Sequence, residues 1–552
     1  MSTPATLILV TALLAAGWAV DAGADRSTVC TITVNSADEA AMFRRSLPED
    51  KFRFVELVER GRPDWLASAC RQGIRCDVLI ISGHFDGVTD FYSDAVDARE
   101  FLPVAEMERV SCSDSCPGLF SQLKEVYLFG CNTLNPDAVN GTAPEIAHML
   151  ARSGHSRVEA ERMVRAMTAR HGESSRDRMR GIFANVPVIY GFSSVAPLGP
   201  TAASILGRYF QSTSSREVGK GRTSAALLGH FAAHAMTAAS GLRESDPQAG
   251  YRREVCQFFD ERMSPAQKLG FIHKLLRGEI SEVHLFFGRI EQFFASLSET
   301  ERKAPALVRA LDETARDEAA RDRYLAFARN ADQPALRARM VAVAGTLGWL
   351  SPIEQRAELM RMINDLLAGN SISVADVDLV CALNRDHALD SDVPPLQLSP
   401  PPVDTAAHSA ALACLGSADG RARVLQALAS PNDDDVRIAQ VYLKYRPITD
   451  VVDLRVVTAA VARMTGSEAQ VRALDVLGRH YVSDPESLEE LARLFPLARS
   501  VNVQRAIAGI LIRSDHAAIA KPEIVRLLRE HRLKSPDGKD LIDALIRRLS
   551  VA

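Results

Sequence analysis

His84 and Cys131 are the two residues whose types and sequence contexts could together perform nucleophilic chemistry. Each follows a short apolar run and a single glycine: the run at 78–82 precedes His84, and the run at 126–129 precedes Cys131. A thiolate is the reactive form of cysteine, and a nearby imidazole can accept the thiol proton and later protonate a leaving amine. The two contexts therefore predict a cysteine–histidine dyad.

The two apolar runs are the elements that must position this dyad. Short runs rich in β-forming residues are typical of strands buried on both faces of a parallel sheet. Parallel neighbours lie roughly 4.8 Å apart and end at the same edge, and open α/β sheets bind ligands beyond that carboxyl edge. We therefore expect His84 and Cys131 to share one crevice. Gly130 would allow a substrate carbonyl to approach closely, and the Cys131 N–H could serve as an oxyanion donor.

The sequence around the dyad alternates between strand and helix patterns. Such alternation predicts a mainly parallel sheet covered by helices, which is an α/β fold. Beside the two strands already described, the expected strands are at 29–34, 51–58 and 186–194, and the expected helices are at 36–45, 63–71, 143–151, 158–170 and 201–210.

The strand ends Ser-Gly-His84 and Gly-Cys131-Asn-Thr resemble those of the caspase-like cysteine peptidases, which include caspases, metacaspases, gingipain-like and CHAT-type proteases. In caspases the histidine likewise lies about 50 residues before the cysteine. The resemblance covers roughly residues 26–215 and implies that His84 is the general base and Cys131 the nucleophile. The flank Leu-Phe-Gly-Cys-Asn-Thr is more similar to CHAT-type sequences than to the Gln-Ala-Cys-x-Gly of caspases. The chain departs from the family at Phe85, where relatives usually have a glycine whose N–H helps to form the oxyanion hole.

Substrate-binding residues are expected on both sides of the dyad. The segment at 86–117 is expected to be long and irregular and to cross the mouth of the crevice. Its acidic residues form either a solvated loop or a wall that selects a basic P1 side chain, with Asp86 the nearest to the dyad. In the caspase-like family the strand that corresponds to 186–194 borders the substrate groove. The resemblance thus implies that Ser193 and Ser194 line the S1 side, and a simple turn is the alternative.

His171 is also followed by a glycine, but it comes after Cys131 and ends a helix-forming run. We therefore interpret it as the last residue of a helix, stabilised by the helix dipole and followed by Gly172 as the C-terminal cap, rather than as the catalytic base. The arginine-rich stretch at 170–180 would be a site of self-cleavage for an enzyme with basic specificity.

The first residues indicate export. An uncharged apolar stretch occupies 5–20, and the small residues at 22–24 provide a cleavage pattern, so residues 1–24 are predicted to be a signal peptide. No lysine or arginine precedes the stretch, which leaves an uncleaved anchor as the alternative, although the stretch is short for a membrane span. We expect a periplasmic or secreted protein with no stable membrane span after cleavage.

The sequence contains nine cysteines, which favour disulfides in an oxidising compartment. Setting Cys131 aside leaves an even number. Cys112 and Cys116 flank Ser-Asp-Ser and could close a small ring, whereas a metal site there is disfavoured because no matching His/Cys pair lies nearby. Cys30 and Cys76 begin expected strands that are neighbours in caspase-like sheets, so the resemblance makes them a second candidate pair.

The length and charge of the chain limit how many domains it can have and which partners it can bind. It has 552 residues, which is too long for one ordinary domain, and a net charge of −4. It contains no basic run or aromatic-basic stripe, so nucleic acid is not expected as a partner. We divide the chain into the signal peptide, a caspase-like domain at 25–220, a helical linker domain at 221–330 and a helical-repeat domain at 331–552.

The last part of the chain shows a weak internal repeat. Strand patterns end at about residue 222, beyond which amphipathic helices follow one another. Arg437, Arg472 and Arg505 occupy equivalent positions in similar helical segments. The pattern resembles HEAT-like repeats over roughly residues 330–550, in which helix pairs stack to form a curved surface. An irregular helical bundle is the alternative.

Together these features predict an α/β caspase-like domain followed by an all-α, HEAT-like region, in an exported cysteine endopeptidase that acts on a protein or peptide substrate. The helical repeats would recognise the substrate or a protein partner. The chemistry requires no metal or organic cofactor, and the acidic loop leaves a response to calcium open. The alternative is a catalytically degenerate scaffold that acts as an interaction module, which Phe85 favours. A dyad by itself also does not exclude another acyl transfer.

Overall fold

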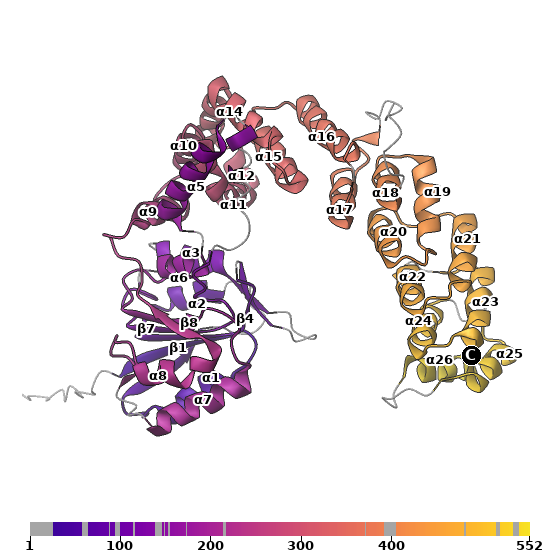
Figure 1. The fold of residues 1–552 in the computed structure, drawn as a ribbon, viewed down its shortest axis with the longest axis horizontal. Helices are drawn as coiled ribbons and strands as arrows, with labels where there is room; N and C mark the ends of the chain where they lie inside the picture. Colours follow the sequence, from indigo (N-terminus) through magenta and orange to yellow (C-terminus); the bar gives the residue numbers. More distant parts are fainter. Residues whose placement is uncertain are drawn as a thin grey trace, which may run out of the picture. The chain divides into compact units, whose positions relative to one another are not determined.

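The computed structural model describes the chain from residue 26 onward, with gaps. The described residues are 26–57, 65–87, 89–93, 100–113, 116, 118–137, 146–147, 150–152, 155–172, 174–212, 217–369, 371–390, 405–479, 482–514, 519–533 and 540–551. The predicted signal peptide, part of the acidic segment and most of the expected helix at 143–151 lie outside them. The chain divides into two compact units between Ala310 and Leu311 (Figure 1).

The first unit is built on a six-stranded sheet. Its strands are β1 (Ser27–Thr33), β2 (Phe52–Glu56), β3 (Val78–Ser82), β7 (Glu125–Phe129), β8 (Val188–Phe192) and β9 (Met236–Ala239). The strand order is β2-β1-β3-β7-β8-β9. Neighbouring strands pair in parallel from β2 to β8, whereas β9 pairs with β8 antiparallel. The predicted mainly parallel sheet is therefore confirmed.

β9 contradicts the expectation that strands end before residue 222. Its sequence Met-Thr-Ala-Ala has little intrinsic preference for a strand. The strand forms because β8 would otherwise leave its edge of backbone N–H and C=O groups unpaired. The sheet thus continues past residue 220, the end expected for the α/β domain.

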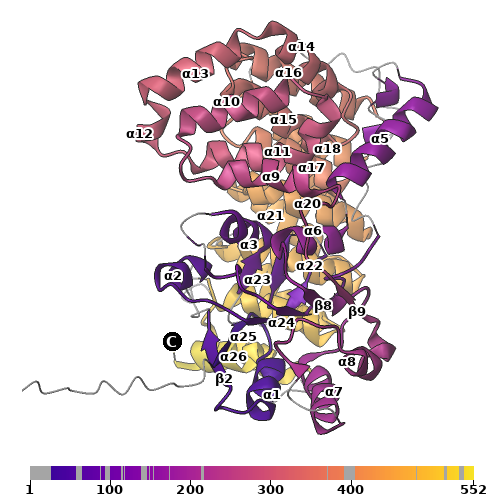
Figure 2. The same cartoon turned by 90° about the vertical axis from the view of Figure 1, so that its left-hand side faces the viewer.

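Helices cover both faces of the sheet. Those of the first unit are α1 (Asp38–Ser46), α2 (Trp65–Arg71), α3 (Val104–Cys112), α5 (Arg157–His171), α6 (Ser175–Ile182), α7 (Gly199–Ser212), α8 (Ala225–His230), α9 (Ala249–Phe259), α10 (Pro265–Leu276), α11 (Ile280–Ser296) and α12 (Glu299–Arg302), with a 3₁₀ turn η2 (Ala232–His234). Figure 2 shows α2, α3 and α6 on one face of the sheet and α1, α7 and α8 on the other.

The central strands β3 and β7 are buried along their whole length. Because successive side chains of a strand point to opposite faces, Leu79 and Ile81 belong to the core under α2, α3 and α6, while Val78 and Ile80 belong to the core under α1, α7 and α8. This double burial explains why both strands read as continuous apolar runs in the sequence.

A small antiparallel sheet follows β3 directly. Its strands are β4 (His84–Phe85), β5 (Asp90–Tyr92) and β6 (Phe101–Pro103), in that spatial order. The segment at 86–117, which we expected to be irregular, therefore contains two strands and helix α3. The strands are too short to show a periodic pattern in the sequence, and they form through pairing with one another.

The cysteine pairs differ in part from the expectation. Cys30 and Cys76 form a disulfide, as expected. The expected ring between Cys112 and Cys116 is wrong: Cys112, the last residue of α3, is joined to α9, whereas Cys116 lies beyond the turn at Ser113 and is joined to α2. Because α3 packs against both α2 and α9, each of the two cysteines meets a partner on a different helix. The full set of pairs is Cys30–Cys76, Cys70–Cys116, Cys112–Cys256 and Cys381–Cys414.

The described part of the second unit is helical. After α13 (Pro305–Ala315), which spans the boundary, its helices are α14 (Glu318–Arg329), α15 (Pro334–Thr346), α16 (Pro352–Leu367), α17 (Val374–Leu383), α18 (Ala406–Cys414), α19 (Ala418–Ala427), α20 (Asp433–Tyr445), α21 (Val451–Ala462), α22 (Ser467–Arg479), α23 (Pro485–Leu494), α24 (Val501–Leu511), α25 (Pro522–Glu530) and α26 (Leu541–Val551), with a 3₁₀ turn η4 (Phe495–Leu497). None of the described helices of the chain combines the length and apolarity that crossing a membrane requires.

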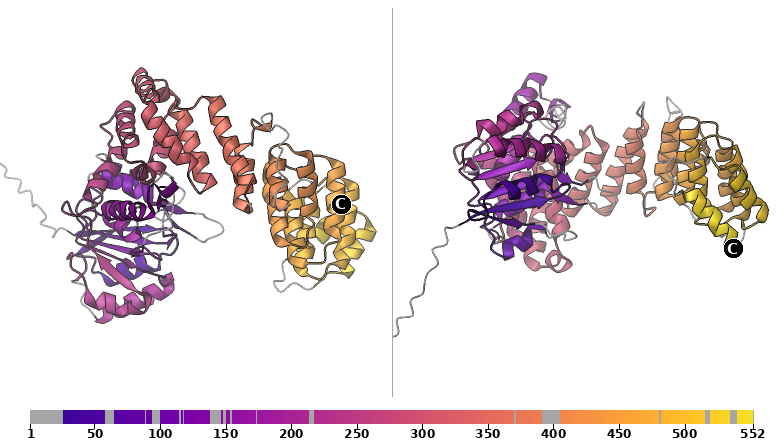
Figure 3. Two further views of the ribbon diagram at one scale, coloured as in Figure 1. Left: turned by 45° about the horizontal axis from the view of Figure 1, so that its top comes forward. Right: turned by 90° about the horizontal axis from the view of Figure 1, so that it is seen from below.

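Helices α18 to α26 stack in two rows, coloured orange to yellow in Figure 3. One row contains α18, α20, α22, α24 and α26, and the other contains α19, α21 and α23. Buried glutamines repeat one contact along the first row: the Gln470 amide donates to the carbonyl of Val461, and the Gln504 amide donates to that of Phe495. Each amide thereby satisfies a carbonyl at the end of a preceding helix.

Candidate functional site

The order of the strands marks the carboxyl edge of β1, β3 and β7 as a ligand-binding position. The chain passes from β1 to β2 on one side and from β3 to β7 on the other, so the strand order reverses between β1 and β3. Open α/β sheets bind ligands in the crevice that such a reversal opens. Ser82 and Phe129 are paired at the ends of β3 and β7, and His84 and Cys131 each lie two residues beyond this pair.

Gly83 and Gly130 allow the two strand ends to touch. A Cβ atom on Gly130 would lie 2.9 Å from the Gly83 carbonyl oxygen and 2.9 Å from the Cβ of Phe85. Both distances are shorter than real Cβ contacts, so only glycine fits between β7 and β4. The contact places the backbone that presents Cys131 against the backbone that presents His84.

Cys131 is the free cysteine of the chain and is half-buried. Its Sγ accepts a hydrogen bond from the Ala196 N–H at 3.3 Å. The next residue, Asn132, has a left-handed backbone with φ 58°, which asparagine tolerates better than most residues. Its N–H donates to the Ser194 carbonyl at 2.8 Å. The chain thus turns sharply after β7 and holds the sulfur against the segment that follows β8, where an N–H donor stabilises negative charge on it.

His84 lies on the less buried face of the small sheet, where it is half-buried and its Nε2 is shielded from solvent. The register places it directly opposite Tyr92, which in turn lies opposite Phe101. The His84 and Tyr92 rings are 5.5 Å apart between centroids. Tyr92 and Phe101 are 41% and 54% exposed, so this row of aromatic rings borders the solvent beside the imidazole.

Phe85 packs into the core on the α2, α3 and α6 face of the sheet. Its side chain is buried and its ring lies 4.7 Å from that of Phe91. The Asp86 N–H donates to the Asp90 carbonyl, and hydrogen-bonded pairs alternate along an antiparallel ladder. The alternation directs the Phe85 N–H away from β5. The Phe85 side chain thus packs inward, while its N–H lies on the edge of β4 that faces away from β5.

Asp86 is engaged in the turn that joins β4 to β5. Its carboxylate accepts hydrogen bonds from the Thr89 N–H at 2.7 Å, from the Thr89 hydroxyl and from the Asp90 N–H at 3.1 Å. These bonds fix the turn and with it the two short strands. The described residues thus give Asp86 a structural contact in the turn, in addition to the substrate-binding role expected from the sequence.

Ser193 borders a cavity of about 500 Å³ next to the segment that follows Cys131. The Ser193 hydroxyl donates to the Ala235 carbonyl at 3.2 Å, and Ser194 contributes its carbonyl to the Asn132 turn. Two arginines of α6 line the cavity: Arg176 is exposed, and Arg180 donates to the Ser240 carbonyl at 2.9 Å and to Asp246 at 2.6 Å. The cavity is lined by Leu134, Pro136, Arg176, Arg180, Ser193, Thr237, Ala238, Ala239 and Ser240.

The sequence analysis missed this cavity because it did not predict α6. The arginines of α6 drew attention only as a stretch for self-cleavage. Most of that stretch is helical, in the last turn of α5 and in α6, so a protease would have to unwind it first. His171 ends α5 and Gly172 caps it with φ 70°, as predicted.

Within the described ranges, no group of three or more His, Cys, Asp or Glu side chains is placed to hold a metal ion. The comparisons with known proteins found no matching family model, no matching curated protein and no matching solved structure. By its fold and candidate site, the protein consists of an α/β unit with a free cysteine and a histidine at adjoining strand ends, followed in its described part by a helical unit with its own disulfide.

Proposed function

We propose that the protein is an exported cysteine endopeptidase of the caspase-like kind, in which Cys131 and His84 form the catalytic dyad. The observation that carries the proposal is the contact across Gly130. Cys131 is the free cysteine, and this contact brings the end of β7, which leads into Cys131, against the start of β4, which carries His84. The mainly parallel sheet and its reversal between β1 and β3 support the same crevice.

The proposed reaction has two steps. His84 takes the thiol proton, the Cys131 sulfur attacks the peptide carbonyl, and the amine leaves with the proton returned by His84, which gives a thioester. Water then attacks the thioester, with His84 accepting its proton and returning it to the sulfur as the carboxylic acid departs. The N–H groups of Cys131 and Phe85 are the proposed donors to the oxyanion. The burial of the Phe85 side chain supports this assignment despite the departure from glycine.

The cavity beside Ser193 supports a preference for an acidic P1 side chain. Arg176 gives its wall a positive charge, because the second arginine, Arg180, is already paired with Asp246, whereas Asp86 is committed to its turn. A carboxylate that enters the cavity would be attracted by the exposed Arg176 guanidinium. The proposal thus favours acidic over basic substrates, the reverse of a basic preference set by Asp86.

The second unit is proposed to recognise the protein substrate or a partner through HEAT-like repeats. Support comes from the two stacked rows of helices and from the repeated glutamine contact. Four disulfides support export, because such bonds persist in oxidising compartments. A non-catalytic scaffold remains the second candidate function, and the absence of glycine at Phe85 is the observation in its favour.

Electrophilic peptide probes with Asp, Lys or Arg at P1 test the function directly. We expect the Asp probe to label the mature wild-type protein, and the Cys131→Ala and His84→Ala variants to lose that labelling. His155→Ala, which changes an exposed histidine before α5, is the matched control and should label normally. Arg176→Glu should lower labelling by the Asp probe about tenfold or more, because it removes one charge-assisted contact to the P1 carboxylate. Absence of labelling by every probe, with or without calcium, would favour the scaffold.

A further inference from the structure

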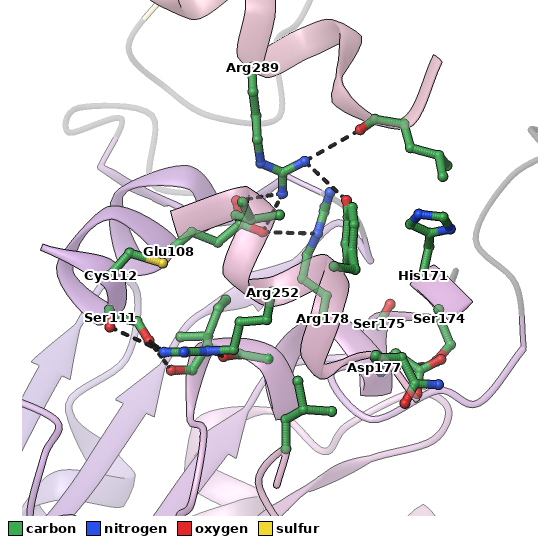
Figure 4. Close-up of a pocket in the computed structure, with 18 of the residues that line it drawn as sticks. Glu108, Ser111, Cys112, His171, Ser174, Ser175, Asp177, Arg178, Arg252 and Arg289 are labelled. Atoms are coloured by element: carbon green, nitrogen blue, oxygen red, sulfur yellow. Dashed lines mark hydrogen bonds and ion pairs between the residues drawn. The ribbon is translucent and has the colours of Figure 1, made fainter. Parts of the chain in front are cut away.

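A second cavity of the first unit, of about 250 Å³, lies apart from the candidate dyad. It is enclosed by α3, α6, α9, α11 and the end of α5, and Figure 4 shows the side chains that line it. His84 and Cys131 do not line this cavity. Its chemistry is therefore independent of the function proposed above.

Guanidinium and carboxylate groups meet beside this cavity. Arg289 donates to both Glu108 carboxylate oxygens at 2.8 Å, and Arg178 lies 3.7 Å from the same carboxylate. Both carboxylate oxygens of Glu108 are therefore already engaged by arginines. Figure 4 shows Arg289 and Arg178 converging on Glu108, with Arg252 set apart beside Ser111.

Arg252 adds a positive charge whose hydrogen bonds all go to neutral groups, while Glu244 acts on it electrostatically without a hydrogen bond. Its Nε donates to the Gly181 carbonyl at 2.8 Å, and its Nη2 donates to the Ser111 carbonyl and hydroxyl at 3.2 Å and 3.1 Å. The remaining nitrogen, Nη1, has no hydrogen-bond partner among the described residues. A largely buried guanidinium without a carboxylate partner is costly unless an anion reaches it.

Arg289 also keeps an unused donor. Its Nε is buried and has no acceptor within the described part of the chain, while Nη1 donates to Tyr251 at 3.2 Å. Asp177, a second carboxylate among the described lining residues, is engaged elsewhere. It accepts from the Ser174 hydroxyl at 2.7 Å and pairs with Arg180, which lies outside this cavity.

The rest of the lining is largely apolar. Ile182, Leu242, Val255 and Leu285 form walls between the charged groups, and His171 and His284 complete the titratable groups that face the cavity. A cavity of about 150 Å³ already admits a benzene ring, so this volume accommodates a ring with a short chain. We propose that the cavity binds a small organic anion, with its charged group at Arg252 and Arg289 and its apolar body against these walls.

Titration calorimetry on the full-length protein tests the proposal with 3-phenylpropionate, phenyl phosphate and inorganic phosphate. The neutral 3-phenylpropanol and the cationic 3-phenylpropylamine are the matched controls. We expect at least one aromatic anion to bind about tenfold or more tightly than both controls, as the loss of one charged contact predicts. Whichever of 3-phenylpropionate and phenyl phosphate binds more tightly shows whether the cavity prefers a carboxylate or a phosphate. Equal binding of the alcohol or the amine, or binding of neither aromatic anion at millimolar concentration, would overturn the proposal, and binding of inorganic phosphate alone would reject the apolar subsite.

Gly181 provides a variant that blocks the cavity without removing a contact. It lines the cavity, and a Cβ on it would meet no atom within 4 Å. Gly181→Leu should therefore abolish anion binding while the protein stays folded, and Gly181→Ala should keep both the fold and most of the binding. Arg252→Gln should weaken binding about tenfold. Unchanged binding to Gly181→Leu would place the ligand elsewhere and contradict the proposal.

Discussion

At the scale of single residues, the surroundings of Cys131 come from three separate segments. β7 delivers the residue, Asn132 turns the chain in a left-handed conformation, and the Ala196 N–H reaches the sulfur from beyond β8. None of these contacts requires an unusual side chain. The nucleophile is instead held by backbone groups, whose positions depend on the packing of neighbouring strands.

Glu39 shows how the core beneath this edge responds to pH. Its side chain is 3% exposed in the first turn of α1, and burial raises the pKa of its carboxyl from 4.5 to about 7, with a smaller contribution from Asp38. Because the folded-state pKa lies above the unfolded one, the protonated form is favoured by folding. The stability that Glu39 contributes is full below pH 4.5 and is lost as the pH rises through 7, by about 3 kcal/mol.

Glu39→Gln should remove this dependence. The difference in unfolding free energy between the variant and the wild type should move in favour of the variant by about 3 kcal/mol from pH 4 to pH 8. Urea denaturation across that range measures it. Glu49→Gln, which changes an exposed glutamate after α1, serves as the control and should follow the wild type. A constant difference between Glu39→Gln and the wild type would show that the carboxyl titrates normally.

At the scale of elements, the crevice depends on how closely β4 approaches the end of β7. Phe85 and Phe91 fill the space behind Gly130, and the Phe91 ring lies 3.1 Å from the position of a Cβ on that glycine. The small sheet is thus anchored by its buried row, while its other row contains the half-buried His84 and the exposed Tyr92 and Phe101. Because successive side chains of a strand point to opposite faces, one row of the small sheet packs into the core and the other row carries the candidate histidine.

Gly130→Ala should push β4 away from β7. We expect a loss of about 1–3 kcal/mol in stability, typical of overpacking, together with slower labelling of Cys131 by peptide probes. Gly229→Ala is the matched control, because a Cβ on that exposed glycine of α8 meets nothing within 4 Å. Chemical denaturation and probe labelling of both variants measure the effect. Equal behaviour of the two variants would contradict the close contact assigned to Gly130.

At the scale of the whole molecule, each compact unit has its own core and its own disulfides. Cys112–Cys256 closes a loop of 144 residues in the first unit, and Cys381–Cys414 closes one of 33 residues in the second. In the chain-entropy description these loops correspond to about 5 and about 4 kcal/mol of stabilisation. Separate cores predict that the units unfold in separate transitions.

Calorimetry of two paired variants tests this independence. Replacing Cys112 and Cys256 by alanine should lower one unfolding transition and leave the other unchanged. Replacing Cys381 and Cys414 should do the opposite. If either double variant shifts both transitions by the same amount, the units unfold as one and the division is wrong.

The sequence by itself determined the central strands, the flanking helices α1, α2 and α7, and the two residues of the candidate dyad. Each of these leaves a local pattern: an apolar run that ends in glycine, or a helical period with its cap, as at His171 and Gly172. The mainly parallel sheet followed from the alternation of these patterns. The pairing of Cys30 with Cys76 followed from the family resemblance.

Only the tertiary structure decided the partner of Cys112, the strand β9, the burial of Phe85 and the position of Arg176 beside Ser193. In each case the deciding energy comes from a segment distant in the chain: α9 for Cys112, the open edge of β8 for β9, the ring of Phe91 for Phe85. Such pairings leave no local period, because the sequence around one partner does not record where the other will fold. The residues that could do chemistry could therefore be predicted from the sequence, whereas the cavities could not.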